Sequence, residues 1–394
     1  MLGLQLLTGA GVLAAVGLHP FTTYPLSLAA LARLRPRPVA AEPAALQANA
    51  TADGFTAPNP RVALCVCAYN EEKVIRAKAE NMLSMRRLVP DLELLIYVDA
   101  ASDRTAEILR EYEGEITVIA SPLRHGKTFG MNTLVQTSGA DFIVFSDANV
   151  TFAPDAIPRL LARFADPGVG CVCGHLVYTL TDDSATAVTG SIYWRLEETI
   201  KELETRSGST MGADGSIFAI RRALHRPPPP DIIDDMYVSL SILCDGHRIV
   251  RAGDALAFEV ATSQSGDEFR RKVRIACQAF NVHRLLQADL AGLSLLDQYK
   301  YVSHKLLRWF TVYLLSASTL CLAAGLAVLG AWLPLLLGVV SGAALLFAGW
   351  LRPAGPPGKL VDIGAAFVAT GVGVIRSLRG ERFQVWTPPA SARG

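Results

Sequence analysis

The sequence predicts an α/β domain flanked by membrane-spanning helices. Between residues 62 and 147, short apolar runs typical of strands alternate with patterns typical of helices. At both ends of the 394-residue chain there are long stretches without Asp, Glu, Lys or Arg. Strands that alternate with helices form a parallel sheet with helices on both faces. A chain of this length accommodates one large domain together with further segments.

The composition excludes several classes of protein. The formal net charge is only +1, so no broad electrostatic field attracts nucleic acid, and no nucleic-acid partner is expected. The seven cysteines are odd in number and include no Cys-x-x-Cys pair, which disfavours a zinc site or a disulfide framework. Cys65 with Cys67, and Cys171 with Cys173, lie in apolar runs where alternate residues share one strand face. We therefore expect them to be small core residues.

The predicted elements follow one another in a regular order. Polar residues stand where three of the strands end: Asn70-Glu71, Asp99 and Asp147. Open α/β sheets bind ligands beyond the carboxyl ends of their strands, so these residues predict a ligand site at one edge of the sheet. Strands are expected at 62–67, 92–98, 116–120 and 142–145, and helices at 71–85, 105–112 and 128–137.

Two common nucleotide-binding folds are disfavoured. No Gly-x-Gly-x-x-Gly follows the first strand, as a dinucleotide-binding fold would require. Gly126-Lys127-Thr128 resembles the end of a P-loop, but residues 121–125 lack its first glycine. An ATPase is therefore not indicated, although Lys127 remains a candidate to bind phosphate.

Two acidic segments are candidates for chemistry. Asp147 follows an apolar strand and precedes Asn149, which places two oxygen ligands on one side of an extended segment, where Mg²⁺ or Mn²⁺ could bind. Asp234 and Asp235 stand directly before an amphipathic helix, where one of them could act as a general base. Each segment also has a plainer interpretation, as a turn or a helix cap.

A basic cluster precedes the C-terminal membrane region. Its four members fit either a patch that faces anionic lipid headgroups or a clamp on a diphosphate. They are Arg270, Arg271, Lys272 and Arg274.

Two apolar regions are long enough to cross a membrane. Residues 310–351 contain no charged side chain and can span a hydrocarbon core of about 30 Å twice, with a turn at 330–334. Residues 1–32 also lack charges and are followed by Arg33, Arg35 and Arg37. Without a basic cluster at the start or a clear small-residue cleavage site, they are not expected to be a removable signal peptide. The arginines after them favour a cytoplasmic location for the middle domain.

A third apolar stretch, at 361–375, is shorter and contains Asp362. It is either a further span or an interfacial segment, and the N-terminal segment with its two prolines is either a simple span or a broken one. The expected organisation is a membrane segment (1–32), a linker rich in Ala and Pro (33–60), the α/β domain (61–290), an amphipathic interface helix (291–309), a transmembrane hairpin (310–351), and a third membrane or interfacial segment with a basic tail (352–394).

Taken in order, these motifs resemble those of family 2 glycosyltransferases, the group that includes cellulose, chitin and hyaluronan synthases. The resemblance covers roughly residues 61–308. It rests on Ala68-Tyr69-Asn70-Glu71-Glu72, on the second-strand signature at 98–105, on Arg124-His125-Gly126-Lys127, on Phe145-Ser146-Asp147-Ala148-Asn149, on the glycine-rich segment 211–222, and on Asp234-Asp235.

The resemblance implies a GT-A type (Rossmann-like) nucleotide-sugar-binding domain and direct displacement with inversion at the anomeric carbon. It implies Asp235 as the general base beside Asp234, and Mg²⁺ or Mn²⁺ at Asp147 and Asn149. The residues implied on the acceptor side are Gly212, Asp214 and Gly215, and those implied to bind the donor are Asn70, Glu71, Asp99, Lys127, Asp147, Arg271 and Arg274.

Two departures from the family pattern qualify this picture. Asn149 replaces the second acid of the Asp-x-Asp metal motif, so Asp147 would be the main anchor of the cation. Arg271-Lys272-Val273-Arg274-Ile275 stands where processive synthases have Gln-x-x-Arg-Trp, keeping only the arginine. We expect transfer from a nucleotide-diphosphate donor, a UDP-sugar, to a membrane glycan or lipid acceptor.

We expect a multi-pass protein of the plasma (inner) membrane of a bacterial cell, with its catalytic domain in the cytoplasm. Its expected partners are membrane lipids and other proteins of polysaccharide assembly. The alternatives are a processive synthase that extrudes its product, and an inactive nucleotide-binding membrane protein.

Overall fold

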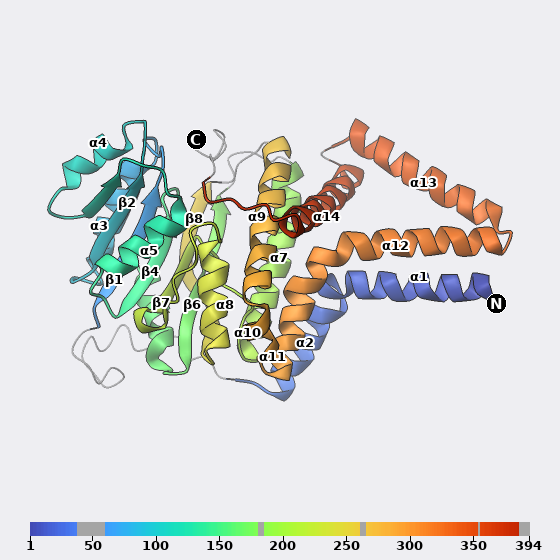
Figure 1. Cartoon of the computed structure of the whole chain (residues 1–394), viewed down its shortest axis with the longest axis horizontal. Helices are drawn as coiled ribbons and strands as arrows, with labels where there is room; N and C mark the ends of the chain where they lie inside the picture. Colours follow the sequence, from blue (N-terminus) through green and yellow to red (C-terminus); the bar gives the residue numbers. More distant parts are fainter. Residues whose placement is uncertain (38–59, 180–184, 261–264, 354, 386–394) are drawn as a thin grey trace.

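The computed structural model describes residues 1–37, 60–179, 185–260, 265–353 and 355–385. Most of the linker expected at 33–60 lies outside these ranges, as does the end of the basic tail. Figure 1 shows a sheet-containing domain at one end of the molecule and a group of long helices that project from it at the other.

The domain is built on an eight-stranded mixed sheet in the order β3-β2-β1-β4-β7-β6-β8-β5. The predicted parallel arrangement holds for β3, β2, β1 and β4, but β7 runs antiparallel to both of its neighbours. The strands are β1 (Val62–Ala68), β2 (Glu93–Asp99), β3 (Thr117–Ser121), β4 (Phe142–Asp147), β5 (Thr151–Phe152), β6 (Val169–Thr179), β7 (Ile217–Arg221) and β8 (Arg248–Val260).

Helices cover both faces of the sheet because side chains along each strand alternate between two cores. In β1, Val62 and Leu64 face the core under α3, α4 and α6, whereas Ala63 and Cys65 face the core under α5, α8 and α9. Cys65 is fully buried, as the alternation predicted. The helices are α3 (Ile75–Met85), α4 (Thr105–Leu109), α5 (Lys127–Thr137), α6 (Ala156–Ala162), α8 (Asp234–Cys244) and α9 (Ser265–Leu285).

The first helix after β1 starts later than predicted. It was expected from residue 71, but α3 begins at Ile75. The backbone N–H of Glu71 donates to Thr105 Oγ1 at 2.7 Å, and that of Glu72 donates to Asp103 Oδ2 at 3.1 Å. Side chains that follow β2 thus hold residues 71–74 in a turn. These hydrogen bonds compete with helix formation, and the local sequence does not reveal them because the partners come from another segment.

The N-terminal apolar stretch is divided rather than continuous. α1 (Leu2–Leu18) ends in a short turn at His19–Phe21, and α2 (Thr23–Leu34) then packs on α7 (Ala185–Arg206). Pro20 lacks the N–H that would continue the helical ladder. The side chains of Tyr24 and Leu28 are fully buried against Ile200 of α7, so the second half of the stretch belongs to the domain.

The interface helix expected at 291–309 is also buried in part. α11 (Leu295–Tyr301), a π-helical turn (Val302–Leu306) and α12 (Leu307–Val328) form one continuous helix. Lys300, Ser303 and His304 are buried in it, against α7 and the turn that precedes α2. Polar side chains that alternate with apolar ones here serve an internal polar network, which we describe below.

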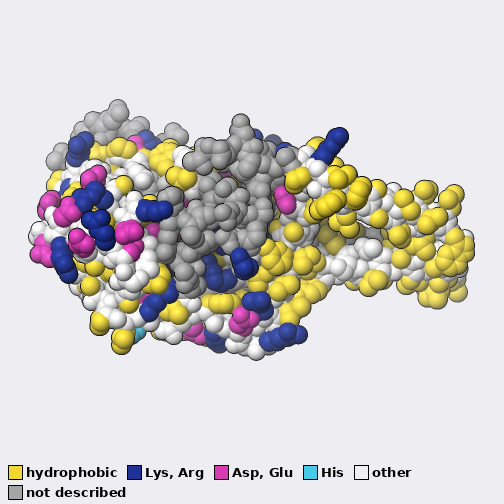
Figure 2. Space-filling view, turned by 90° about the horizontal axis from the view of Figure 1, so that it is seen from above, with side chains coloured by type: hydrophobic (Ala, Val, Ile, Leu, Met, Phe, Trp, Pro, Cys, Tyr) yellow, Lys and Arg dark blue, Asp and Glu magenta, His cyan; other side chains and the backbone are white. Residues whose placement is uncertain are grey.

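The long helices form the projecting part of the molecule. α1 packs along α12, α13 (Trp332–Leu351) folds back from α12 after Gly330, and α14 (Pro356–Leu378) packs against α9. By length and composition, four described stretches could cross a membrane: 2–21, 295–328, 332–351 and 356–378. Figure 2 shows that hydrophobic side chains make up most of this projecting surface.

After α14 the chain returns to the sheet domain. Asn281 and Gln278 of α9 donate to the carbonyl oxygens of Glu381 (3.0 Å) and Phe383 (3.1 Å), and Gln384 Nε2 donates to the carbonyl of His125 at 3.2 Å. The carbonyl of Gln384 presses so closely on Gly126 that a Cβ there would lie 2.1 Å from it. We call residues 381–385 the C-terminal strap. Figure 1 shows it running past α9 toward the sheet.

Candidate active site

The predicted acids gather at one edge of the sheet. Asp99 ends β2 and Asp147 ends β4, and β1 lies between these parallel strands. The first residues of α5 and α8 reach the same edge, since Lys127 forms an ion pair with Asp147 and lies 3.8 Å from Asp234. The structure therefore joins segments that are separated by more than a hundred residues in the chain.

Asp99 shapes the loop that precedes α5. Its buried carboxylate accepts the backbone N–H groups of His125 at 2.7 Å and Gly126 at 2.9 Å. Gly126 has φ +90°, a conformation that favours glycine, and directly precedes Lys127. The guanidinium of Arg124 lies over the ring of Tyr69, 3.4 Å from its centroid. Asp99 thus orients the loop that presents Lys127.

Lys127 links the two acidic segments. Its Nζ donates to Asp147 Oδ1 at 2.7 Å and lies 3.8 Å from Asp234 Oδ2. Burial acts to lower the pKa of Lys127, but Asp147 and Asp234 together raise it above its ordinary value. The ammonium therefore stays charged at neutral pH, which suits a group that neutralises phosphate oxygens.

Asp235 has the properties of a general base. Burial and the adjacent Asp234 raise its pKa to about 7, although Lys127 acts in the opposite direction. Its Oδ1 accepts the N–H of Met236 at 2.6 Å, and its Oδ2 lies over Gly215, where a Cβ would come within 2.7 Å. A carboxylate whose pKa lies near neutral pH is well matched to abstracting a hydroxyl proton.

The loop before β7 approaches this base from the other side. Gly212 has φ +110°, and Asp214 donates its backbone N–H to Cys173 Sγ at 3.3 Å. Asp214 Oδ2 lies 3.7 Å from the ammonium of Lys201 on α7. The three residues expected on the acceptor side therefore lie in one loop, and Gly215 is the member that meets Asp235.

Two site residues escaped sequence reasoning. Glu259, next to last in β8, accepts a hydrogen bond from Asn149 Nδ2 at 2.9 Å. Burial and the neighbouring carboxylate of Asp147 raise the pKa of Glu259 to about 7. Lys78 of α3 is buried beneath the Asp147 segment and donates to Ser146 Oγ (2.6 Å) and to the carbonyl of Val150 (2.7 Å). Neither residue stands out from the polar and apolar pattern of the helix or strand to which it belongs.

The remaining predicted donor residues lie around this centre. Asn70, with φ +52°, accepts the N–H of Ser102 at 2.7 Å and so joins the loops after β1 and β2. Glu71 lies in the same turn. On α9, Arg271 is an electrostatic neighbour of Glu259. Arg274 donates to Gln278 at 3.1 Å, one turn further along.

Comparisons with known proteins identify the domain that carries this site. Residues 63–226 match the family model described as Glycosyl transferase family 2. The chain contains a family 2 glycosyltransferase domain. An N-acetylglucosaminyltransferase of Rhizobium leguminosarum is 24% identical over 261 residues, which are 62% of this chain and 61% of that protein. This chain thus spans about three fifths of that relative's length.

Two further proteins are similar to this chain, one over part of the domain and the other over the whole fold. A beta-monoglucosyldiacylglycerol synthase of Synechocystis is 30% identical over 152 residues, 37% of this chain and 31% of that protein. A mannosyltransferase of Pyrobaculum calidifontis, solved with GDP-mannose and Mn²⁺, superposes with a TM-score of 0.71 at 20% identity. The superposition covers 95% of this chain and 99% of the other, so the two proteins share their overall fold, including the GT-A-like α/β domain, over nearly the whole molecule.

The site offers suitable oxygen ligands for a divalent cation, though few of them. Among the residues that the structure describes, no group of three or more His, Cys, Asp and Glu side chains could hold a metal by itself. Asp147 and Glu259 are neighbouring carboxylates, and Asn149 adds an amide beside them. Such a donor set fits Mg²⁺ or Mn²⁺ that takes its remaining ligands from water and a diphosphate.

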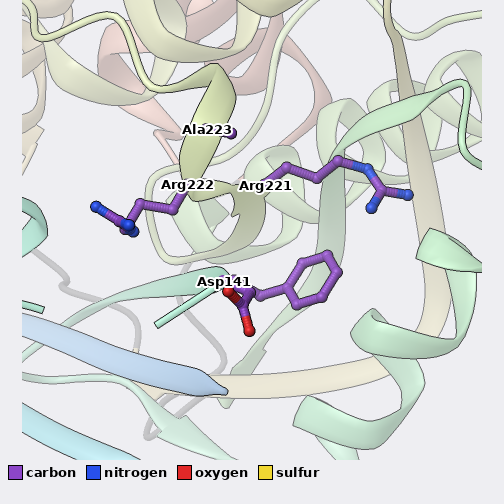
Figure 3. A pocket seen from close by; sticks show the side chains of 5 residues that line it. Asp141, Arg221, Arg222 and Ala223 are labelled. Atoms are coloured by element: carbon purple, nitrogen blue, oxygen red, sulfur yellow. The ribbon is translucent and has the colours of Figure 1, made fainter. Parts of the chain in front are cut away.

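A hollow at the opposite end of β4 is not part of this site. It is lined by Asp141, Phe142, Arg221, Arg222 and Ala223. Figure 3 shows the two arginines pointing away from each other on either side of it. Arg221 donates to the carbonyls of Val169 and Phe164, and Arg222 donates to that of Ala140, so both hold local backbone in place.

Proposed function

We propose that the protein transfers a sugar from a nucleotide-diphosphate donor to a membrane-associated glycan or lipid acceptor. The observation that carries the proposal is the position of Lys127, whose ammonium joins Asp147, a candidate donor-side acid, to the acidic pair that begins α8. Glycosyl transfer needs a cationic site for the departing diphosphate and a base for the acceptor hydroxyl, held in a fixed relative position.

At the donor side, Lys127 and a cation held by Asp147, Asn149 and Glu259 would bind the diphosphate. The bound cation would supply neutralisation of the charge that develops on the leaving group. Lys78 would hold the Asp147 segment from below through Ser146 and Val150. A UDP-sugar is the expected donor. The superposed mannosyltransferase was solved with GDP-mannose, so the screen below includes GDP-sugars as well as UDP-sugars.

At the acceptor side, Asp235 would remove the proton of the acceptor hydroxyl while its oxygen attacks the anomeric carbon. The bond to the nucleoside diphosphate breaks on the opposite face, which inverts the configuration. Asp234 contributes by raising the proton affinity of Asp235. The loop that contains Gly212, Asp214 and Gly215 would border the acceptor.

The projecting helices would hold the protein in the plasma (inner) membrane, where its acceptor resides. Arg33, Arg35 and Arg37 follow the N-terminal apolar region, and by the positive-inside trend they support a cytoplasmic catalytic domain. The Synechocystis relative is named as a synthase of a glucosylated diacylglycerol, which supports a lipid acceptor. Other proteins of polysaccharide assembly are candidate partners.

The test uses the full chain purified in detergent. A panel of nucleotide sugars is screened for release of the nucleoside diphosphate, with and without Mn²⁺, in the presence of membrane lipid extract. We expect one class of donor to be consumed in a metal-dependent manner and a glycosylated lipid or glycan to form. Failure of every donor would overturn the proposal and favour a nucleotide-binding protein without activity.

A matched pair of variants tests the base. Asp235→Asn removes the proposed base, whereas Asp245→Asn changes an exposed aspartate just beyond the C-terminal end of the same helix, where it pairs with Arg226. We expect Asp235→Asn to lower transfer by about 10²–10⁴-fold and Asp245→Asn to leave it near wild type. Unchanged transfer by Asp235→Asn would show that the base lies elsewhere.

A further inference from the structure

A buried polar network fills the junction between the domain and the membrane helices. The ring of His304, in the π-helical turn, bonds Glu204 Oε1 at 2.8 Å and Glu197 Oε1 at 2.9 Å. The hydroxyl of Tyr24 donates to Glu204 at 2.5 Å, and Arg308 forms an ion pair with Glu197. α2, α7 and the helix that becomes α12 thus meet through charged groups.

The network extends to the acceptor-side loop. Glu204 Oε2 accepts hydrogen bonds from Thr210 Oγ1 at 2.9 Å and from the N–H of Met211 at 3.1 Å. Lys300 Nζ donates to the carbonyls of Glu204 and Ser209. The loop that meets Asp235 is therefore anchored on the helices that enter the apolar region.

Lys305 lies between this network and the loop. A Cβ built on Gly212 would lie 3.9 Å from Lys305 Cε and 3.8 Å from Ser239 Oγ. Ser239 belongs to the first turns of α8, because its hydroxyl donates to the carbonyl of Asp235 at 2.6 Å. The side chain of Lys305 therefore reaches the acceptor-side loop one helical turn from the proposed base.

Lys305 is half-buried, and among the described residues the structure gives its ammonium neither a hydrogen bond nor an ion pair. Three neighbouring cations each have a partner: Lys201 pairs with Glu198, Lys300 donates to two carbonyls, and Arg308 pairs with Glu197. The nearby carboxylates Glu197 and Glu204 already accept hydrogen bonds from other groups. A charge withdrawn from water in this way is costly unless an anion pairs with it.

The position of Lys305 in the helix matches the depth of a lipid headgroup. Arg308 is the last charged residue before an apolar run that continues to Leu351. Lys305 precedes it by one turn, so it lies where the polar and apolar parts of the molecule meet. Lysine binds phosphate as a compact point charge with three donors.

We propose that Lys305 binds a phosphate ester carried by the acceptor lipid and so holds the acceptor hydroxyl toward Asp235. This inference rests on the proposed function and narrows its acceptor to an anionic lipid. The phosphate belongs either to a phospholipid such as phosphatidylglycerol, whose headgroup carries the hydroxyl, or to a polyprenyl diphosphate whose sugar carries it. Lys305 touches the acceptor away from the reacting bond, so it acts in binding.

The test compares acceptors in uncharged detergent micelles with the donor found by the screen above. Phosphatidylglycerol and a polyprenyl diphosphate that carries a sugar are the anionic acceptors, and diacylglycerol is the neutral one. We expect Lys305→Gln to raise the acceptor KM for one of the anionic lipids by about tenfold to a hundredfold, the worth of one charged hydrogen bond. The lipid that shows this rise identifies the source of the phosphate. Lys305→Arg should restore most of the affinity.

Matched measurements separate binding from a structural role. Lys359→Gln, at the first turn of α14, is the control and should leave the acceptor KM unchanged. Donor hydrolysis without acceptor should be the same in Lys305→Gln and wild type. Native mass spectrometry of both proteins with added lipid phosphate gives a reading that does not require turnover, and Lys305→Gln should retain less lipid.

Two results would overturn the inference. One is an equal rise in the acceptor KM of Lys305→Gln for diacylglycerol and for the anionic lipids. The other is an unchanged acceptor KM with a lower melting temperature. Both results would indicate that Lys305 has a structural role. If the wild type hydrolyses no donor, the proposed function fails instead, and the lipid-retention measurement still decides whether Lys305 binds phosphate.

Discussion

Gly215 gives the sharpest prediction for the acceptor side. In Gly215→Ala the new Cβ would lie 2.7 Å from Asp235 Oδ2, whereas ordinary contacts begin at about 3.4 Å. Relief requires a shift of about 0.7 Å in a carboxylate whose other oxygen is held by the N–H of Met236. A displacement of about 1 Å at a reacting group costs up to a hundredfold in rate. We expect kcat for transfer to fall about tenfold to a hundredfold, or about 1.4–2.7 kcal/mol in the barrier.

The assay measures transfer and donor hydrolysis in parallel. Gly139→Ala is the matched control, because a Cβ there meets nothing nearer than 3.4 Å. It should keep wild-type kcat. The donor KM of Gly215→Ala should stay unchanged, since the donor-side residues are not displaced. A wild-type kcat in Gly215→Ala would refute the position assigned to the base. A rise in donor KM as large as the fall in kcat would show that the substitution disturbs the donor side.

Three further predictions concern single side chains around the site. Because the base acts when deprotonated and the pKa of Asp235 is raised to about 7, kcat/KM should rise as the pH increases through 7 and level off above it. A pH profile that is flat from pH 5 to 9 would contradict this assignment. Asn149→Asp should tighten Mn²⁺ binding and Glu259→Gln should weaken it, each measured as the metal concentration that gives half-maximal turnover. If that concentration shifts in the opposite direction or not at all, Glu259 does not belong to the cation site. Lys78→Met leaves Ser146 and the Val150 carbonyl without their donor, so the melting temperature should fall by several degrees and turnover with it, and an unchanged melting temperature would argue against this support of the Asp147 segment.

The sequence predicts the parts of the fold that depend on local patterns. The order of strands and helices from β1 to β4 follows from apolar runs bounded by polar residues, and Asp99 and Asp147 end their strands as expected. The antiparallel course of β7 could not be foreseen, because strand direction depends on how distant segments return to the sheet. The start of α3 was missed for a related reason, since residues from the next loop hold residues 71–74.

Charged residues that act through distant partners were the hardest to interpret. Lys78 stands in an amphipathic helix and Glu259 in an alternating strand, where each resembles an ordinary solvated side chain. Only folding places them next to the Asp147 segment. His304 likewise belongs to a stretch that predicts an interfacial helix, and its partners Glu197 and Glu204 lie about a hundred residues earlier in the chain. Periodicity indicates which face is apolar and does not indicate which charges will meet.

The C-terminal strap means that the catalytic unit is not one uninterrupted length of polypeptide. Its carbonyl at Gln384 leaves no room for a Cβ on Gly126, and its side chain bonds the His125 carbonyl, so residues that follow the last long apolar helix close the loop that Asp99 holds. A fragment containing only 61–290 would lose that closure together with the packing of α2 on α7. Removing the long apolar helices would therefore also remove the strap's contacts with the His125–Gly126 loop and so loosen the segment that presents Lys127.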